Sequence, residues 1–122
     1  MVKNIFGNES SDDYRLLYQF EKKFHGYRTL KYHKQEENSS GGRWGNPMIP
    51  MIRMSEVYYI AAEAICDKNL AEAQEYVEMV KEGRGVYVDL SSLNKDGLIN
   101  MILNDVQREL SGEGQVFFMF KR

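Results

Sequence analysis

One stretch, Arg53–Ala64, carries the densest helix signal in the sequence. It reads R-M-S-E-V-Y-Y-I-A-A-E-A, and its apolar residues recur three and four positions apart, which is the spacing of one helical face. Glu56 and Glu63 are two turns apart, so they point to the same side of such a helix. We therefore predict a helix over residues 51–67 on which the later elements pack. The face predicted to be buried consists of Val57, Ile60, Ala61, Ala64 and Ile65.

Two further helices are predicted downstream, over residues 69–82 and 94–111. Asn69 is a favourable N-cap, and Glu72 three residues later completes a pair of the capping-box type. Only a short turn separates the helix at 51–67 from this one, so the two should form an antiparallel αα-hairpin. The third helix has an apolar ridge at i+4 spacing, formed by Leu98, Ile102, Val106 and Leu110. The chain is thus expected to be mainly α-helical.

Glycines are expected to end the second and third helices. Gly83 and Gly85 follow the second helix, where we predict left-handed backbone conformations. Gly112 and Gly114 follow the third helix and should stop it. Beyond them, the end of the chain at 116–120 is a run of large apolar side chains, which must be buried in the domain or lead into further structure. If it is exposed, the chain should self-associate through this apolar C-terminal end.

The first 46 residues are predicted to be an irregular, partly extended arm followed by a Gly- and Ser-rich loop. Residues 1–13 are polar and should be frayed or extended. Tyr27–Tyr32 alternates in character and favours a strand. The loop contains the only tryptophan, Trp44, which could stack on a ligand or pack back on the domain; the residues alone favour packing. The helical part of the chain then covers residues 47–122.

Charge and residue counts argue against several classes of function. A net charge of −2 does not fit a nucleic-acid-binding surface, which needs a basic patch. The chain has no run of about 18 apolar residues that would span a membrane. Cys66 is the only cysteine and is expected to be a small buried side chain. The two histidines, His25 and His33, show no metal-ligand spacing, so no metal or cofactor is expected.

Two pairs of glutamates allow an alternative interpretation, a catalytic site. Glu56 with Glu63, and Glu109 with Glu113, could in principle be the acid and base of a glycosidase. Each pair has an arginine nearby, Arg53 or Arg108, and the favoured interpretation is ion pairs that hold helices in register. From spacing alone the chain is a helical packing or binding domain without an active site.

Two segments resemble the SusD/RagB family of cell-surface, nutrient-binding lipoproteins of Bacteroidetes. Residues 52–64, which read I-R-M-S-E-V-Y-Y and then A-E-A, are similar to the family's I-R-x-x-E-x-Y-L…A-E-A. Residues 108–122 are similar to R-x-x-E-(F/L)-x-x-E-G-x-R-(F/W)-(F/Y)-D-L-x-R, and residues 80–85 loosely match N-x-V-R-x-R-A-G. Val116 and Met119 stand where the family has arginine and aspartate, which indicates a divergent branch. The motif residues with an implied structural role are Arg53, Glu56, Glu63, Arg108, Glu109, Glu113 and Gly114.

The resemblance implies a fold of tetratricopeptide-like hairpins stacked into an α-α superhelix. It also implies non-catalytic binding of glycans at the outer membrane and their delivery to a SusC-like TonB-dependent transporter. The chain is then expected to be a piece of a longer lipoprotein, with the signal and lipid anchor outside it. Arg53 or Arg84, and also Arg108, should pair with Glu56 and Glu63. The rival interpretation is a helical scaffold that binds only protein.

The glycan site that the resemblance implies lies in the arm and loop. Sugar rings stack their apolar faces on aromatic side chains, while their hydroxyl groups need amide, carboxylate or guanidinium partners. The residues predicted to contact the glycan are Trp44 above all, with Arg43, Asn46 and Tyr32.

Overall fold

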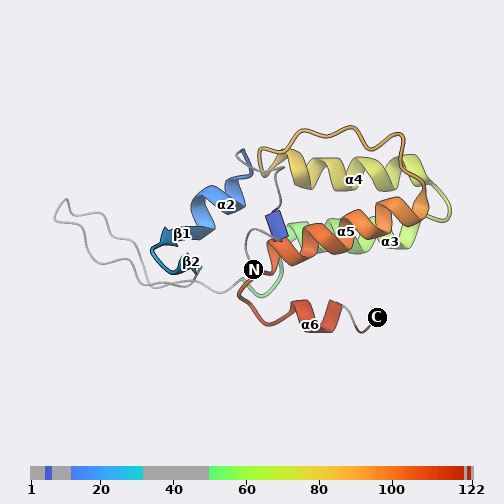
Figure 1. Cartoon of the computed structure of the whole chain (residues 1–122). Helices are drawn as coiled ribbons and strands as arrows, with labels where there is room; N and C mark the ends of the chain where they lie inside the picture. Colours follow the sequence, from blue (N-terminus) through green and yellow to red (C-terminus); the bar gives the residue numbers. More distant parts are fainter. Residues whose placement is uncertain (1–4, 7–11, 32–49, 120, 122) are drawn as a thin grey trace.

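The structure is a computed structural model of the chain and describes residues 5–6, 12–31, 50–119 and 121 (Figure 1). In this part of the chain the fold is mainly α-helical, as predicted. Its elements are α2 (Tyr14–Gln19), β1 (Phe20–Lys23), β2 (Gly26–Thr29), α3 (Met54–Ile65), α4 (Leu70–Glu82), α5 (Lys95–Glu109) and α6 (Val116–Met119). Helices α3, α4 and α5 pack together, with the arm at one end of them (Figure 1).

Helices α3 and α4 form the predicted hairpin, joined by a short turn after Ile65. Asn69 is the N-cap of α4: its side-chain oxygen accepts a hydrogen bond from the backbone N–H of Glu72, at 3.3 Å. The amide of Asn69 in turn donates to the Glu72 carboxylate at 3.0 Å. Asn94 caps α5 in the same way by accepting from the backbone N–H of Gly97, at 2.9 Å. These local bonds satisfy backbone donors that a helix start leaves without partners.

The hydrophobic core lies between the three long helices. The predicted ridge of α5 is buried, and Cys66 is buried beside it, as expected. The segment between α4 and α5 runs back alongside α4 and adds Leu90 to the core (Figure 1). The other buried apolar residues of the core are Tyr59, Ala62, Ala73, Val77 and Val80.

The predicted buried face of α3 is wrong at Val57, Ile60 and Ala64, whereas Ile65 is partly buried against the core. Val57 and Ile60 are 43% and 48% exposed, and Ala64 is also exposed. The face that turns inward instead carries Ser55, Tyr59, Ala62 and Cys66. Two of these side chains bear hydroxyl groups, and both hydroxyls bond to carboxylates of α5. Hydrophobic spacing missed this face because the core here is partly polar.

Several element boundaries also differ from the predictions. Helix α3 begins at Met54, because Arg53 is extended (φ −108°, ψ 135°) and serves as its N-cap. Gly83 is right-handed with φ −61°, so the left-handed prediction is wrong there; at Gly85, with φ +77°, it is confirmed. Helix α5 ends at Glu109, two residues earlier than expected.

The arm is more ordered than expected where the structure describes it. Asp13 caps α2 by accepting from the backbone N–H of Arg15, at 2.9 Å. Phe6 is buried and packs edge-on against Phe20, with ring centroids 5.6 Å apart. The expectation of a frayed or extended segment is therefore wrong at Phe6, which is helical, while Asp13 is extended with φ −68° and ψ 112°. Strands β1 and β2 form an antiparallel hairpin, so the strand predicted over 27–32 lies slightly earlier, at Gly26–Thr29.

The C-terminal apolar run is exposed where it is described. Phe117 and Phe118, in α6, are 61% and 68% exposed. Of the two alternatives for this run, burial within the domain is therefore wrong for these two side chains. No helix in the described ranges is both long and apolar enough to cross a membrane.

Candidate functional site

A buried ion-pair cluster lies where the arm meets α5. We define it as Asp13, Arg15, Lys81, Asp105 and Glu109. The Arg15 guanidinium binds Asp105 through two bonds, Nη2–Oδ1 at 2.9 Å and Nη1–Oδ2 at 3.0 Å. Its Nη2 also lies 2.8 Å from Asp13 Oδ2, and its Nη1 lies 3.5 Å from Glu109 Oε2. Lys81 reaches Asp105 from α4, with Nζ 3.5 Å from Oδ1. Buried charges persist only when paired and hydrogen-bonded in this way.

The environment of Asp105 keeps it ionised. Burial alone would raise the pKa of Asp105, but the bonds from Arg15 and the charge of Lys81 outweigh burial and lower it to about 2. Tyr59 donates its hydroxyl hydrogen to Asp105. Burial and the adjacent Asp105 carboxylate both raise the pKa of Tyr59, so its hydroxyl stays protonated. Asp105 therefore stays charged and Tyr59 stays neutral near neutral pH.

Glu109 ties three elements together. Arg84 binds it through two bonds, Nε–Oε2 at 3.0 Å and Nη2–Oε1 at 2.6 Å. Ser55 of α3 donates to Glu109 Oε1 at 3.0 Å. Burial would raise the pKa of Glu109, but the bonds and charge of Arg84 lower it overall. A general acid of a glycosidase needs a raised pKa, so this carboxylate is suited to holding helices and not to donating a proton.

Glu113 is the second carboxylate of the C-terminal motif, and it also binds two cations. Its Oε1 lies 2.8 Å from Lys31 Nζ and 2.7 Å from Arg53 Nη2. Burial lowers the pKa of Lys31, while the bond to Glu113 opposes that shift. Both glutamates of the second motif are thus engaged in ion pairs.

The arginines predicted as partners of Glu56 and Glu63 bind other groups in the described part of the chain. Arg53 and Arg84 bind the glutamates of the C-terminal motif. Arg108 donates from Nε to the backbone carbonyl of Ile5 at 2.9 Å, and its Nη1 lies 3.5 Å from Asp105. The reason is geometric: the inward face of α3 carries hydroxyl groups, and the carboxylates that meet the arginines come from α5 and the turn after it.

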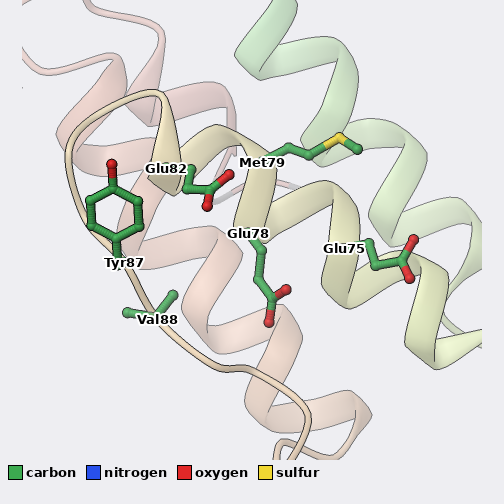
Figure 2. A pocket seen from close by; sticks show the side chains of 6 residues that line it. All are labelled: Glu75, Glu78, Met79, Glu82, Tyr87 and Val88. Carbon is green, nitrogen blue, oxygen red and sulfur yellow. The ribbon is translucent and has the colours of Figure 1, made fainter.

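A groove runs beside α4, with a volume of about 270 Å³ (Figure 2). The carboxylate side chains of Glu75, Glu78 and Glu82 project from α4, and Tyr87 and Val88 come from the segment that follows it (Figure 2). Tyr87 is largely exposed. Glu78 anchors this segment by accepting from the backbone N–H of Leu90, at 2.7 Å. An exposed aromatic ring beside carboxylates is a combination that can contact a sugar. The groove is lined by Glu75, Glu78, Met79, Glu82, Tyr87 and Val88.

The residues predicted to contact the glycan, Tyr32, Arg43, Trp44 and Asn46, all lie within 32–49, outside the described residues. Their role stays a prediction. The described residues nearest to this segment are Lys31 before it and Pro50 after it. Within the described ranges, no three His, Cys, Asp or Glu side chains are grouped so as to hold a metal ion.

Sequence reasoning missed the centre of the buried cluster. Arg15 lies in the segment predicted to be an irregular arm, and its partner Asp105 lies 90 positions away. The only local signal is the Asp13-x-Arg15 pair, in which the aspartate caps α2. Asp105 is also four residues before Glu109, which places both carboxylates on one face of α5.

Comparison with protein families gives one match, to the SusD family, over residues 8–122. The chain belongs to the SusD family. Comparison with curated proteins and with solved structures gave no match. The SusD family consists in general of outer-membrane surface lipoproteins that bind glycans in nutrient uptake, without catalysis. The match includes both the arm and the three long helices, so the arm is part of what this chain shares with the family.

Proposed function

We propose that this chain takes part in binding a glycan at the outer surface of the cell and in delivering it to a SusC-like TonB-dependent transporter. The observation that carries the proposal is the match to the SusD family over residues 8–122. The protein that contains this chain is then a surface lipoprotein anchored in the outer membrane. The tetratricopeptide-like superhelix is part of the same proposal, and the α3–α4 hairpin would be one of its repeats.

The ion pairs support binding without catalysis. Glycoside hydrolysis needs one carboxylic acid with a raised pKa and a second carboxylate beside the same sugar. Glu109 is 1% exposed and has a lowered pKa. Glu113 is bound to Lys31 and Arg53. Both carboxylates are therefore already engaged in ion pairs that hold the fold together.

Two surfaces are candidates for the glycan-binding site. The first is the loop that contains Trp44, with Arg43, Asn46 and Tyr32 as its polar and aromatic neighbours in sequence. A tryptophan ring has a large apolar face for a sugar ring, and the guanidinium and amide groups can bond its hydroxyls. The second is the groove beside α4, where Tyr87 is the exposed ring. We favour Trp44 because tryptophan offers the larger stacking face.

Affinity gel electrophoresis on a panel of soluble α-glucans, β-glucans, xylans and mannans tests this proposal. We expect Trp44→Ala to abolish the retardation that the wild type shows with one of these polysaccharides. Tyr87→Ala is the matched control, because it also removes one exposed aromatic ring. Retardation that survives Trp44→Ala and is lost in Tyr87→Ala would move the site to the groove. Unchanged retardation in both variants would refute both candidate surfaces, and no retardation of the wild type would refute glycan binding by this chain.

One observation favours the second candidate, a helical scaffold that binds protein. Val57 and Ile60 of α3 and Phe117 and Phe118 of α6 are all exposed. Large exposed apolar side chains are typical of surfaces that another protein covers. A scaffold without its own sugar site would bind the transporter with the same affinity in wild type and Trp44→Ala, and would retain no polysaccharide. Co-purification with the transporter together with the gel measurement distinguishes the two candidates.

A further inference from the structure

The β1–β2 hairpin is anchored at its base and exposed in its outer half. At the base, Phe20 is buried and packs against Phe6. The N–H of Leu30 also donates to the carbonyl of Gln19, at 2.7 Å. Residues 22–28 are then exposed without interruption. Because successive side chains of a strand point to opposite faces, neither face of this outer half packs on the described part of the domain.

The turn of the hairpin carries a phenylalanine that adds nothing to the core. Phe24 is 97% exposed, and its ring meets that of the neighbouring His25 edge-on, with centroids 5.0 Å apart. Tight hairpin turns favour Asn, Asp and Gly, and here Gly26, with φ +139°, supplies the unusual backbone conformation. An aromatic ring at Phe24 is therefore required neither by the turn nor by the core. Exposed apolar side chains that occur singly are common, so the charges around the ring decide its interpretation.

The side chains around Phe24 are mainly basic. Lys22 and Lys23 directly precede it, and Arg28 lies opposite Glu21 in the hairpin. Glu21 is shared by two of these cations, with Lys23 Nζ at 2.6 Å and Arg28 Nη2 at 2.7 Å. Three positive side chains and one negative one leave the hairpin with a formal charge of +2, whereas the whole sequence carries −2. Positive charge is thus concentrated around the exposed ring.

We infer that the tip of the β1–β2 hairpin is a contact site for an anionic lipid surface. The ring of Phe24 enters the boundary between headgroups and acyl chains, while Lys22 and Lys23 stay level with the phosphate groups. Basic side chains combined with an apolar ring are typical of segments that lie in this interface. Charge complementarity favours an anionic partner, and the ring favours one with an apolar layer beneath its charges.

Two other classes of partner fit these observations less well. A neutral polysaccharide offers no negative charge to the cations of the tip. A stable protein interface buries about 800 Å² on each partner, which is more than a turn with one exposed ring provides. That a lipid surface lies near this hairpin rests on the proposed function, through the outer-membrane location. Binding of the hairpin to lipid can nevertheless be measured without any glycan.

Co-sedimentation with vesicles of phosphatidylcholine and phosphatidylglycerol in equal amounts tests the inference. We expect the wild type to bind these vesicles, to bind vesicles of phosphatidylcholine alone far more weakly, and to be released by salt, because salt screens exposed charges. Phe24→Ser should weaken binding to the mixed vesicles by about tenfold, because the burial of the ring is lost. Lys22→Gln should weaken it by about fivefold, the effect of one basic side chain near an anionic surface.

Tyr87→Ser and Lys68→Gln are the matched controls. Tyr87 is another exposed ring, and Lys68 is an exposed lysine in the turn before α4. Both variants should bind the mixed vesicles as the wild type does. Equal losses in Phe24→Ser and Tyr87→Ser, or no binding by the wild type, would overturn the inference.

The gel measurement separates this inference from the proposed function. A Phe24→Ser variant that binds vesicles normally but loses retention by the polysaccharide would overturn the lipid contact and assign the tip to the glycan. If the wild type is not retained by any polysaccharide, glycan binding fails, while the vesicle measurement still decides the role of the hairpin.

Discussion

Replacing Asp105 with asparagine should destabilise the protein by about 3–5 kcal/mol, the usual cost of removing one partner from a buried ion pair. Asp105 accepts two bonds from Arg15, at 2.9 and 3.0 Å, and a third from the Tyr59 hydroxyl. Lys81 adds a second positive charge 3.5 Å away. Arg108 adds a third positive charge, with its Nη1 also 3.5 Å away. Asparagine keeps the shape of the side chain but removes its charge, so these three cations would lose their shared anion in a site with almost no access to water.

Urea unfolding followed by far-ultraviolet circular dichroism measures this loss. Asp96→Asn is the matched control, because Asp96 is an exposed residue in the first turn of the same helix. Its carboxylate lies at the N-terminal end of the helix dipole, so the control should cost less than about 1 kcal/mol. If Asp105→Asn is too unstable to measure, Tyr59→Phe removes one bond to the same carboxylate and should cost about 1–3 kcal/mol. Losses below about 1 kcal/mol in both variants would refute the buried cluster as a determinant of stability.

The same carboxylate predicts how stability depends on pH. The pKa of Asp105 is about 2 in the folded protein, below its ordinary value of about 3.9 in an unfolded chain. A group whose pKa is lowered by folding stabilises the protein above its unfolded pKa, and this contribution is lost as the pH falls toward the folded pKa. Asp105 should therefore contribute about 2 kcal/mol that disappears between about pH 4 and pH 2. In Asp105→Asn the loss of stability over this interval should be smaller than in the wild type, and equal losses would contradict the assignment.

Two further substitutions test the backbone and the surface. Gly85→Ala should lower the free energy of unfolding by about 2 kcal/mol or more, because Gly85 has φ +77° and a Cβ atom would lie 2.9 Å from the Tyr14 ring. The control is Gly83→Ala, at a right-handed residue, which should be close to neutral in the same urea measurement. Equal losses in the two variants would refute this reasoning. Phe118→Ser should shift the isolated chain toward monomer in sedimentation velocity with a change in stability within about 0.5 kcal/mol, because the ring is 68% exposed. A wild-type chain that is already monomeric at all concentrations would argue against self-association through this end.

Features that depend on neighbours in sequence could be predicted. The N-caps at Asn69 and Asn94 follow from one side chain and a backbone N–H three residues later. The apolar ridge of α5 follows from the helical period, and Gly85 from the need for a left-handed residue. Each of these features depends only on residues that are close to one another in the sequence.

The inward face of α3 could not be predicted in this way. Ser55 and Tyr59 turn inward because their hydroxyls bond to carboxylates 54 and 46 positions away. Val57 and Ile60 are more apolar and still lie outside. Hydrophobic spacing predicts burial from the free energy of transferring a side chain to an apolar environment. It therefore predicts the wrong buried residues where the interior is built from ion pairs.

The sequence indicated which residues of the candidate site matter, but not which residues they contact. The resemblance to the SusD family implied a structural role for Glu109 and Glu113, and in the structure both carboxylates are engaged in ion pairs. Their partners were not predicted, because Arg84, Lys31 and Arg53 reach them through the tertiary fold. The glycan contacts assigned to Trp44 and its neighbours stay a prediction for the gel measurement.

The distance in sequence between Arg15 and Asp105 has a consequence for synthesis on the ribosome. Arg15 is made 90 residues before the carboxylate that it binds through two bonds. At about 5–20 residues per second, it waits roughly 5 to 18 seconds for that partner to be added to the chain. During this interval α3 and α4 can already form their hairpin, since their contacts are local, whereas the arm has no place to dock. The buried cluster can therefore close only after α5 has been synthesised, when the α3–α4 hairpin is already able to form.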